Sequence, residues 1–569
     1  MKPIHRLPDS PSPLLSIRNL SIALPRGADR PLALNSVSFD LHAGEILCVV
    51  GESGSGKSLT AAALLGLLPQ GVNICGGQAL WHADGATSDD LLTLSPAQLR
   101  SLRGRRIGMI FQEPMSALNP LHTIGTQLIE VFQVHTALSR RDIDAKVLDL
   151  LQAVHIADPA RTLRAYPHEL SGGQRQRVMI AMALALEPAL LIADEPTTAL
   201  DVTTQAQILQ LIHDLQRRRG TAVLFITHDF GVVADIADRV VVMQQGKLVE
   251  SGTADNVLQH AVHPYTQSLI AAVPSMLPPA PRNRVQALLS ASGAAASSAA
   301  PPALTLRGVS KTYQPRGWFN RHLRPAPAVA DLSLTLPAGS TLGIVGESGS
   351  GKSTLARLIL GLLTPDAGEL LVSGQLLPSG GAAQRRARAR QIQMVFQDPY
   401  SSLNPRHRVG DIVAQGPREQ GVTRSQALAQ ARDLFALVGL DPNALHRYPH
   451  EFSGGQRQRI GLARALALQP QILLADEPVS ALDVSVQAQV LALLARLRAQ
   501  LGLSILFITH DLRVAAQVCD RIAVMKDGRI VEEGDTATLF ADPRHPYTQA
   551  LLASVPGQHW HALTAAQVA

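Results

Sequence analysis

Short, uninterrupted apolar runs that end at a glycine or at paired carboxylates recur along the chain. Runs of this length, bounded by turn residues, are typical of buried strands. After the runs that end in glycine, the pattern changes to a helix-compatible one, as in Ser58-Leu-Thr-Ala-Ala-Ala-Leu-Leu. The hydrophobic pattern therefore predicts an α/β fold in which strand, loop and helix follow one another. The four runs are Glu45-Ile-Leu-Cys-Val-Val50, Ala189-Leu-Leu-Ile-Ala193, Leu342-Gly-Ile-Val345 and Ile472-Leu-Leu-Ala475.

The whole pattern occurs twice. Gly51-Glu-Ser-Gly-Ser-Gly-Lys-Ser58 returns as Gly346–Ser353, and Ser171-Gly-Gly-Gln-Arg-Gln-Arg177 returns as Ser453–Arg459. Collinear repeats at a nearly constant, long spacing predict two duplicated domains and exclude a solenoid. Further pairs in the same order are Phe111-Gln112 with Phe396-Gln397, Asp194-Glu-Pro with Asp476-Glu-Pro, Thr227-His228-Asp with Thr509-His510-Asp, and His263-Pro-Tyr-Thr-Gln267 with His545 to Gln549.

The composition between the repeats shifts to prolines and small residues. Pro278-Pro-Ala-Pro281 is followed by an Ala/Ser-rich stretch that ends at Pro302. Such residues cannot bury enough apolar surface to fold, so a linker is expected. We predict a first domain over residues 14–277, a linker over 278–302, a second domain over 303–556 and a tail over 557–569.

Composition and charge narrow the functional class only slightly. The chain has 569 residues, of which 46% are apolar and 17% charged, and a net charge of +6. The basic run Arg385-Arg-Ala-Arg-Ala-Arg390 has no interleaved aromatic residues, so a solvated helix face is expected rather than a nucleic-acid site. Three widely spaced cysteines offer no metal-ligand spacing, and Cys48, inside an apolar run, is expected in the core.

Any membrane role is expected to be peripheral. No apolar stretch reaches the roughly 20 residues that cross a bilayer. The first residues, Met1-Lys-Pro-Ile-His-Arg, lack the apolar region of a signal peptide.

Two sets of residues carry candidate phosphate chemistry. In each GxxxxGK[ST] loop, backbone N–H groups and a helix N-terminus would present partial positive charge to phosphates. Lys57 would reach the terminal phosphates and Ser58 would ligate magnesium, with Lys352 and Ser353 in the same roles. A second anion-receptive helix end opens at Ser171-Gly-Gly-Gln, so each repeat has two such ends.

Adjacent carboxylates follow the second apolar strand of each repeat, as Asp194-Glu195 and Asp476-Glu477. Two neighbouring carboxylates at a strand tip repel each other unless a cation is close. We therefore predict that the first carboxylate of each pair serves the magnesium shell and that the second polarises an attacking water molecule.

These elements together resemble the ATP-binding-cassette superfamily, from about residue 14 to 274 and from about 303 to 556. The resemblance implies an α/β fold with two tandem P-loop ABC nucleotide-binding domains. Each would have a RecA-like α/β core, an antiparallel β subdomain and an α-helical signature subdomain. It implies ATP and Mg²⁺ as ligands and two hydrolytically competent sites.

The resemblance also implies roles for individual residues. Phosphate-loop contacts to ATP would come from Gly51, Ser53, Gly54, Gly56, Lys57 and Ser58, and from Gly346, Ser348, Gly349, Gly351, Lys352 and Ser353. The magnesium sets would be Ser58, Gln112 and Asp194, and Ser353, Gln397 and Asp476. Catalytic glutamates would be Glu195 and Glu477, switch histidines His228 and His510, and D-loop aspartates Asp201 and Asp483.

In this family two cassettes pair head to tail, and the signature of one closes over the ATP of the other. The signatures here would be Leu170–Gln174 and Phe452–Gln456. Ser171 and Gly173 would then face the nucleotide on Lys352. The reciprocal contacts to the nucleotide on Lys57 would come from Ser453 and Gly455.

Two positions depart from the family pattern. Phe452 is an apolar replacement at the start of the second signature and is expected to be tolerated. Tyr313 fits the adenine-stacking position in the second repeat, but the aligned residue of the first repeat is Leu24. The first site is therefore expected to hold adenine without a ring stack and to bind ATP less tightly.

Within the superfamily the chain is most similar to the dipeptide and oligopeptide importer ATPases. The likeness rests on three repeated segments: Phe111-Gln-Glu-Pro-Met-Ser-Ala-Leu-Asn-Pro120 and its copy Phe396–Pro405, Tyr166-Pro-His-Glu and Tyr448-Pro-His-Glu, and His-Pro-Tyr-Thr followed by Val273-Pro274 and Val555-Pro556. Some relatives carry a cysteine cluster for iron and sulfur after this last segment, and none is expected here.

By this resemblance the chain would lie at the cytoplasmic face of a bacterial inner membrane. Its partners would be two membrane permease subunits, gripped after each Q-loop glutamine, and an extracytoplasmic solute-binding protein. The two cassettes would pair within one chain, and no nucleic-acid partner is expected. The alternative is a soluble tandem cassette acting on ribosomes or DNA. That alternative would favour a charged helical linker or zinc-binding cysteine pairs, whereas the linker here is rich in alanine, proline and serine.

Overall fold

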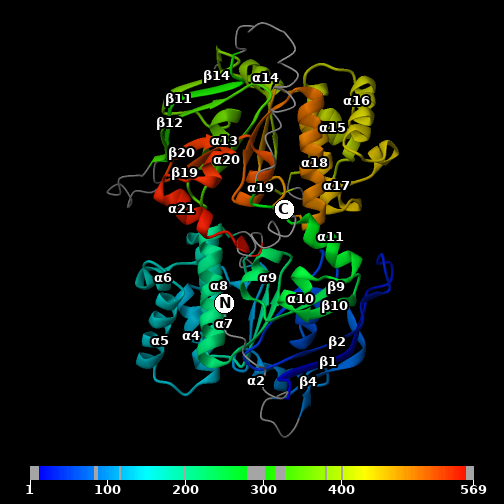
Figure 1. Cartoon of the computed structure of the whole chain (residues 1–569), viewed down its shortest axis with the longest axis vertical. Helices are drawn as coiled ribbons and strands as arrows, with labels where there is room; N and C mark the ends of the chain where they lie inside the picture. Colours follow the sequence, from blue (N-terminus) through cyan, green and yellow to red (C-terminus); the bar gives the residue numbers. More distant parts are fainter. Residues whose placement is uncertain are drawn as a thin grey trace. The chain divides into compact units, whose positions relative to one another are not determined.

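The computed structural model describes residues 12–82, 88–113, 117–197, 200–277, 301–313, 327–377, 381–398, 402–480, 482–558 and 560. Within these residues both repeats fold into the same succession of strands and helices (Figure 1). Residues 278–300 of the predicted linker and 561–569 of the predicted tail lie outside the described part, as do residues 114–116 and 399–401 after the Q-loop glutamines.

A six-stranded sheet forms the centre of the first repeat, in the order β10-β9-β3-β8-β7-β6. Neighbouring strands are parallel except for β9 and β10, which are antiparallel. Because parallel strands end at one edge of a sheet, the segments after β3 and β7 come together there. The strands are β3 (Ile46–Val50), β6 (Ile107–Ile110), β7 (Leu190–Asp194), β8 (Ala222–Ile226), β9 (Arg239–Gln244) and β10 (Lys247–Thr253).

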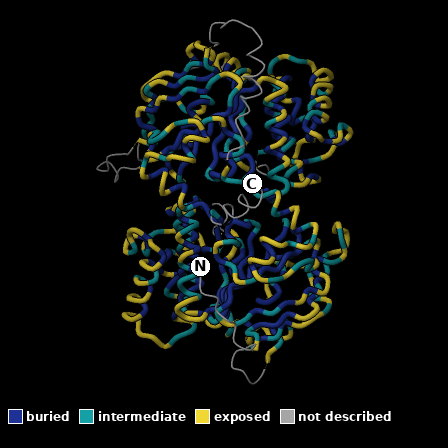
Figure 2. The backbone as a smooth tube through the Cα atoms, viewed as in Figure 1, coloured by how far each residue is buried: buried dark blue, intermediate teal, exposed yellow. Residues whose placement is uncertain are grey.

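The two faces of this sheet belong to two different cores. Leu47 and Val49 of β3 pack with a second, antiparallel sheet of order β2-β1-β4-β5. Their neighbours Ile46, Cys48 and Val50 pack against helices on the opposite face. This alternation follows from the two-residue period of a strand. Figure 2 shows buried backbone inside each repeat and exposed backbone toward its periphery. The second sheet has β1 (Leu15–Ala23), β2 (Leu32–Leu41), β4 (Asn73–Trp81) and β5 (Asp89–Asp90).

The helices of the first repeat fall into two groups. Helices α4, α5, α6 and α7 contact one another and form a helical subdomain (Figure 1). The remaining helices flank the sheets. Their bounds are α1 (Lys57–Leu64), α2 (Pro96–Leu102), α4 (Ile124–His135), α5 (Arg140–Ala153), α6 (Pro159–Arg164), α7 (Gly172–Leu184), α8 (Val202–Arg219), α9 (Phe230–Ile236), α10 (Ala254–Gln259) and α11 (Pro264–Ala272).

The second repeat has the same architecture, with sheets of order β16-β17-β18-β13-β19-β20 and β12-β11-β14-β15. Its strands are β11 (Leu304–Thr312), β12 (Pro327–Leu336), β13 (Thr341–Val345), β14 (Ala367–Val372), β15 (Gln375–Leu376), β16 (Ile392–Val395), β17 (Ile472–Asp476), β18 (Ser504–Ile508), β19 (Arg521–Lys526) and β20 (Arg529–Asp535). Its helices are α13 (Lys352–Leu360), α14 (Ala382–Gln391), α15 (Val409–Glu419), α16 (Arg424–Leu437), α17 (Gly454–Leu466), α18 (Val484–Leu501), α19 (Leu512–Val518), α20 (Thr536–Ala541) and α21 (Pro546–Ala553).

The predicted fold class is therefore confirmed: each repeat is an α/β core with an antiparallel β subdomain and a helical subdomain. Cys48 is fully buried, as expected from its apolar run. The expectation for the basic run needs one correction. Arg385, Arg386 and Arg390 are exposed on α14, but Arg388 is buried because the helical period turns it toward the protein.

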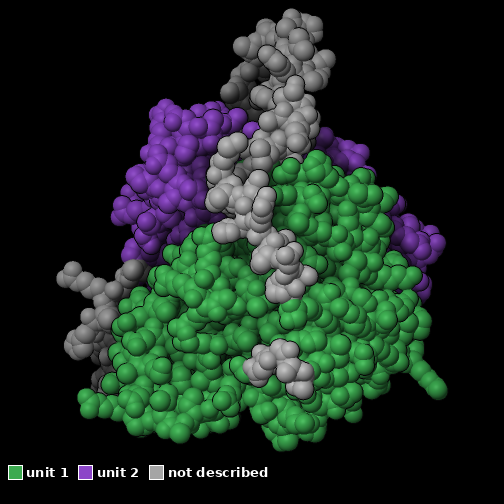
Figure 3. All heavy atoms as spheres, turned by 60° about the horizontal axis from the view of Figure 1, so that its bottom comes forward, with its two compact units in different colours: residues 1–200, 204–273, 556–569 green, residues 201–203, 274–555 purple. Residues whose placement is uncertain are grey.

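The chain divides into two compact units whose boundaries do not follow the repeats (Figure 3). One unit comprises residues 1–200, 204–273 and 556–569, and the other comprises residues 201–203 and 274–555. In the first unit, Gly557 N–H donates to Asp235 Oδ2 (3.1 Å) and Trp560 is only 6% exposed. In the second, Gln517 Nε2 donates to the Ser275 and Leu277 carbonyls at 2.7 and 2.9 Å. The first unit thus includes a segment that begins at Pro556, after the second repeat, and the second unit includes a segment that begins at Pro274, after the first repeat.

Candidate active sites

Each phosphate loop begins at a glycine that no other residue can replace without displacement. Gly51 follows β3 with φ +149°, and Gly346 follows β13 with φ +151°. A Cβ at Gly51 would collide with the Met243 carbonyl, and one at Gly346 with the Met525 carbonyl. The loops end at Gly56 and Gly351, whose positive φ angles lead directly into α1 and α13.

The loop lysines lie folded over their own loops. Lys57 Nζ donates to the Gly51 and Glu52 carbonyls at 2.6 and 2.9 Å, and Lys352 Nζ makes the same two bonds in its loop at 2.6 and 2.7 Å. Burial lowers the pKa of Lys352, against the opposing effect of nearby carboxylates, of which Glu477 contributes most. Both ammonium groups are therefore held at the start of a helix, where anions bind well.

A hydroxyl and a carboxylate meet beside the first loop. Ser58 Oγ, at the start of α1, donates to Asp194 Oδ1 at the end of β7 (3.0 Å). Burial raises the pKa of Asp194 to about 6, and the neighbouring Glu195 adds to the rise. In the second repeat, burial and Glu477 raise the pKa of Asp476 to about 6. Because burial disfavours the ionised form of both carboxylates, a bound cation would stabilise that form.

Glu195 lies between two polar side chains from separate loops. Its Oε2 accepts from Gln112 Nε2 (3.1 Å), and its Oε1 lies 3.2 Å from His228 Nδ1. Its φ is +46°, a left-handed conformation that is rare outside glycine. Strained backbone of this kind concentrates at functional sites because the surrounding contacts must enforce it.

Glu477 repeats this arrangement. Gln397 Nε2 donates to Glu477 Oε2 (2.6 Å), His510 Nδ1 lies 3.1 Å from Glu477 Oε1, and φ is again +46°. Burial alone would raise the pKa of Glu477, but His510, Lys352 and Gln397 lower it overall. Burial likewise would lower the pKa of His510, but Glu477 and Asp511 raise it overall. The pair therefore favours the ionised carboxylate with the charged imidazole.

The signature serines cap helices, as their sequence context predicts. Gln174 N–H donates to Ser171 Oγ (3.3 Å), and Ser171 N–H donates to Gln174 Oε1 (3.0 Å). Ser453 and Gln456 form the same reciprocal capping box at the start of α17. Gly173 is the second residue of α7 and lies near Thr204, and Gly455 lies near Val486.

A segment of the first repeat forms part of the second phosphate site. Residues 201–203 group with the second compact unit. There, Thr203 Oγ1 bridges Asp201 Oδ1 and Glu347 Oε1, both at 2.7 Å. The carboxylate of Asp201 also acts to raise the pKa of Lys352, against the larger lowering by burial. Asp483, the equivalent of Asp201, precedes α18 as its N-cap residue.

Comparison with known proteins shows the family to which the chain belongs. A family model described as "ABC transporter" matches residues 34–198 and 329–480. A model described as "Oligopeptide/dipeptide transporter, C-terminal region" matches residues 249–319 and 531–567. The chain belongs to the ABC transporter family.

Full-length relatives agree with this assignment. The peptidoglycan transport ATP-binding protein YejF of Agrobacterium fabrum is 48% identical over 95% of this chain and 96% of its own. The glutathione import ATP-binding proteins GsiA of Salmonella paratyphi A and of Escherichia coli O157:H7 are 47% and 46% identical, over 95% of this chain and 89% of theirs. The predicted family and ATPase activity are therefore confirmed. Among the described residues of this ABC ATPase, no helix is long and apolar enough to cross a membrane.

The two ATP sites differ at the position predicted to stack on adenine. Tyr313 follows β11, is 45% exposed, and its hydroxyl lies 3.4 Å from Thr354 Oγ1 on α13. In the first repeat, Leu24 and Leu59 both pack against the core between the sheets. The structure therefore offers an accessible ring beside one phosphate loop of the ABC ATPase and a core-facing leucine beside the other.

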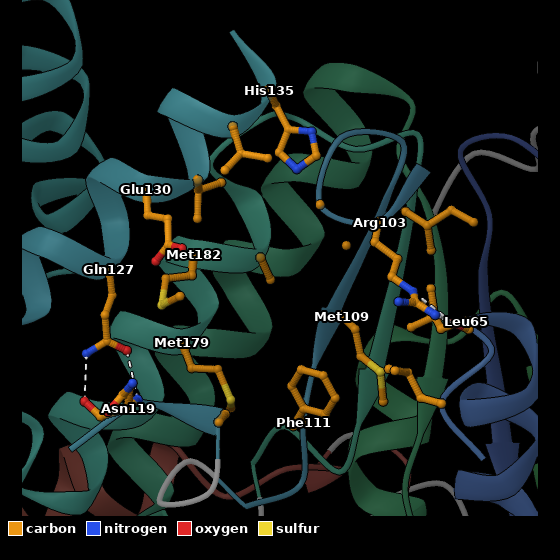
Figure 4. A pocket seen from close by; sticks show the side chains of 18 of the residues that line it. Leu65, Arg103, Met109, Phe111, Asn119, Gln127, Glu130, His135, Met179 and Met182 are labelled. Carbon is orange, nitrogen blue, oxygen red and sulfur yellow. Dashed lines mark hydrogen bonds between the residues drawn. The ribbon is translucent and has the colours of Figure 1, made fainter. Parts of the chain in front are cut away.

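A groove of about 540 Å³ lies between the sheet and the helical subdomain of the first repeat, next to the Q-loop segment (Figure 4). Met109, Phe111, Met179 and Met182 line its apolar part. On its polar side, Gln127 accepts from Asn119 N–H (2.9 Å) and donates to the Asn119 carbonyl (3.1 Å), which holds the chain that follows the Q loop. The groove thus combines an apolar floor with a fixed polar rim.

The matching region of the second repeat has different chemistry. Arg464 occupies the position of Met182, and its guanidinium lies 5.3 Å from the centre of the Phe396 ring, the counterpart of Phe111. Arg464 Nη1 also donates to the Ser402 carbonyl (2.5 Å). A half-buried guanidinium group therefore lies where the first repeat has a thioether.

One pair of residues at the phosphate loops is absent from the predicted site. Tyr265 and Tyr547 of the repeated His-Pro-Tyr-Thr segment touch the phosphate loops through their hydroxyls. The sequence signal was the exact return of this segment in the second repeat, but the segment carries no known phosphate-binding pattern.

Proposed function

We propose that this chain is the ATP-hydrolysing subunit of an importer for peptides or peptide-like solutes. The supporting observation is the combination of two complete glutamate, glutamine and histidine sets with the oligopeptide/dipeptide transporter C-terminal region in both repeats. The chain aligns over 96% of a relative named for peptidoglycan transport and over 89% of one named for glutathione import.

The proposed chemistry at each site is attack of water on the terminal phosphate of ATP. Glu195 and Glu477 would polarise the water, because each carboxylate is held at two points by a glutamine and a histidine. Lys57 and Lys352 would leave their loop carbonyls to bind the terminal phosphates. The hydrolysis set is complete in both repeats, so both sites are expected to turn over.

The residues beside each loop fit a magnesium ion. Ser58 Oγ and Asp194 Oδ1 are 3.0 Å apart, and both oxygens are ligands that this cation prefers. Gln112 donates through its amide nitrogen to Glu195, which leaves its amide oxygen available to a cation. Ser353, Asp476 and Gln397 would form the second set. Bound magnesium would neutralise charge on the phosphates.

We propose that the two cassettes of one chain pair head to tail around two ATP molecules. Ser171 and Gly173 would contact the nucleotide on Lys352, with Ser453 and Gly455 contacting the one on Lys57. The capping boxes at Ser171 and Ser453 support this arrangement, because each signature offers the N-terminus of a helix to a phosphate.

The proposed membrane partners are two permease subunits. An extracytoplasmic solute-binding protein would deliver the solute to them. The groove beside Phe111 suits a short helix of a permease, because it is apolar, open and adjacent to the Q loop that contacts Glu195. The proposed location is accordingly the cytoplasmic face of the inner membrane, as a peripheral subunit. No nucleic acid is needed for this activity.

The decisive experiment measures ATP hydrolysis by the chain reconstituted with a candidate permease pair, binding protein and peptides. Peptide is expected to stimulate hydrolysis, and Glu195→Gln or Glu477→Gln is each expected to remove most of the stimulated rate. If hydrolysis ignores permease and peptide but responds to ribosomes or DNA, the transport proposal is wrong and the alternative of a soluble tandem cassette replaces it.

A further inference from the structure

The phosphate loops of both repeats are held by a tyrosine from far along the chain. Glu52 N–H donates to the Tyr265 hydroxyl (3.1 Å), and Glu347 N–H donates to the Tyr547 hydroxyl (3.0 Å). Tyr265, in the first turn of α11, follows Glu52 by 213 residues. Tyr547, in the first turn of α21, follows Glu347 by 200 residues. The same contact thus occurs in both copies of the duplicated domain.

The contacted N–H belongs to the peptide that also holds the loop lysine. The Gly51 carbonyl and the Glu52 N–H are part of one planar peptide unit. The carbonyl end accepts from Lys57 Nζ (2.6 Å), and the N–H end donates to Tyr265. In the second repeat, the Gly346 carbonyl accepts from Lys352 Nζ (2.6 Å) while the N–H of Glu347 binds Tyr547. Each peptide is thus fixed from both ends.

This peptide needs such fixing because a glycine precedes it. Gly51 and Gly346 have no side chain to restrict rotation of the following peptide, so hydrogen bonds must set its orientation. If the peptide rotated, its carbonyl dipole would turn toward the bound phosphates and repel them. Fixed N–H dipoles are what make such a loop bind phosphate. The tyrosine hydroxyl therefore controls the geometry of the first turn of the loop.

The tyrosines themselves are rigidly seated. His263 Nδ1 accepts from Tyr265 N–H (3.2 Å) and caps α11, and Pro264 occupies the first helical position. The Glu250 carboxylate of β10 accepts from the N–H groups of Val262 (2.7 Å) and His263 (3.2 Å).

The second repeat copies this anchor. Glu532 accepts from the N–H groups of Arg544 (2.8 Å) and His545 (3.0 Å), and His545 Nδ1 accepts from Tyr547 N–H (3.1 Å). Burial raises the pKa of Tyr547 to about 12, so its hydroxyl stays neutral. Lys526 Nζ lies 4.7 Å from the centre of the Tyr547 ring, so a cation–π contact also holds the ring.

We propose that Tyr265 and Tyr547 are positioning residues for ATP, which act by orienting the first peptide of each phosphate loop. The His-Pro-Tyr-Thr segment is then a brace between the C-terminal part of each cassette and its own nucleotide site. This role concerns ATP alone and is independent of the transported solute and of the permeases.

The test uses the full chain with Glu195→Gln and Glu477→Gln, so that ATP binds without turnover, and titrates ATP with magnesium. Tyr265→Phe or Tyr547→Phe is expected to weaken binding about 3- to 10-fold at one site, the size expected for one lost hydrogen bond. The unaltered site in the same chain serves as a reference. Ser268→Ala and Ser554→Ala are matched controls, because these hydroxyls donate only to carbonyls of their own helices (2.7 and 2.8 Å).

A second readout separates positioning from folding. With active glutamates, the phenylalanine variants are expected to raise KM for ATP more than they lower kcat, and the rise in melting temperature on adding ATP should shrink. The proposal is overturned if both phenylalanine variants bind ATP like the serine controls. It is also overturned if they lower only the melting temperature of the nucleotide-free chain while the shift caused by ATP stays unchanged.

Discussion

Gln112 Nε2 donates a 3.1 Å hydrogen bond to the carboxylate of Glu195, although the two residues follow different strands of the central sheet. The equivalent bond between Gln397 and Glu477 is 2.6 Å. The segment after each glutamine leads into the region where we place the permease helix. A displacement of that segment would therefore move the carboxylate that we propose to polarise water.

The first prediction concerns this bond. Gln112→Ala removes one of the two side chains that hold Glu195, so kcat is expected to fall about tenfold, as for a lost charge-assisted hydrogen bond. Because Gln112 is also a proposed magnesium ligand, binding of ATP with magnesium is expected to weaken as well. Steady-state ATPase assays on the reconstituted complex check this. Gln210→Ala is the control, since Gln210 bonds only to Asp214 on its own helix (2.8 Å). Equal losses in both variants would contradict a role for the bond.

The second prediction concerns pH and the raised pKa of Asp194. Because the folded chain holds this proton more tightly than the unfolded chain, stability falls as pH rises from the ordinary value of 3.8 through about 6. The loss is roughly 2–3 kcal/mol above pH 6. Without magnesium or nucleotide, Asp194→Asn is therefore expected to melt higher than the parent chain at pH 7.5, with the gap closing near pH 4.

Thermal melting across this pH range checks the sign. Asp144→Asn is the control, because this aspartate pairs with Arg140 on an exposed helix face (3.0 Å). Added magnesium and ATP should reverse the order, since the asparagine lacks the charge that the cation needs. A constant difference between Asp194→Asn and the parent chain across the pH range would contradict the prediction.

The third prediction concerns the unlike adenine positions. Leu24→Tyr is expected to tighten ATP binding at the first site about tenfold, and Tyr313→Leu to weaken the second by a similar factor, because stacking of a base on a ring contributes about 1–3 kcal/mol. Nucleotide titration of the hydrolysis-blocked chain measures both. Tyr313→Phe keeps the ring but loses the contact with Thr354, so it should bind like the parent chain. A loss in Tyr313→Phe equal to that in Tyr313→Leu would assign the effect to the hydroxyl.

The fourth prediction concerns the groove of Figure 4. Met182→Arg introduces the side chain found at the matching position of the second repeat, and is expected to reduce permease-stimulated ATPase severalfold without altering the basal rate. Leu501→Arg is the control, since this exposed leucine ends α18. Stimulation that survives Met182→Arg unchanged would place the permease contact elsewhere.

Local features of both sites could be predicted from the sequence because each depends on residues close together in the chain. The strand before Gly51, the helix after Lys57 and the capping of α7 by Ser171 follow from apolar runs, glycine spacing and serine placement. The left-handed backbone of Glu195 could not be predicted, because no glycine marks it and distant contacts enforce it.

Contacts between distant segments left no local pattern. The bond from Glu52 to Tyr265 joins residues 213 positions apart, and either residue alone resembles an ordinary surface or core position. Arg388 could not be separated from its exposed neighbours by composition, because only the packing of α14 decides which arginine turns inward. The repeat was the one sequence signal that marked the His-Pro-Tyr-Thr segment.

The burial of Trp560 has a consequence for biosynthesis. Synthesis runs from the N-terminus, but the hydrophobic core built mainly from the first repeat includes this tryptophan near the end of the chain. A nascent chain can form most of the first cassette early, yet that cassette gains Trp560 only after the second repeat has been translated. A chain terminated before Pro556 would therefore carry its packing defect in the half that is made first.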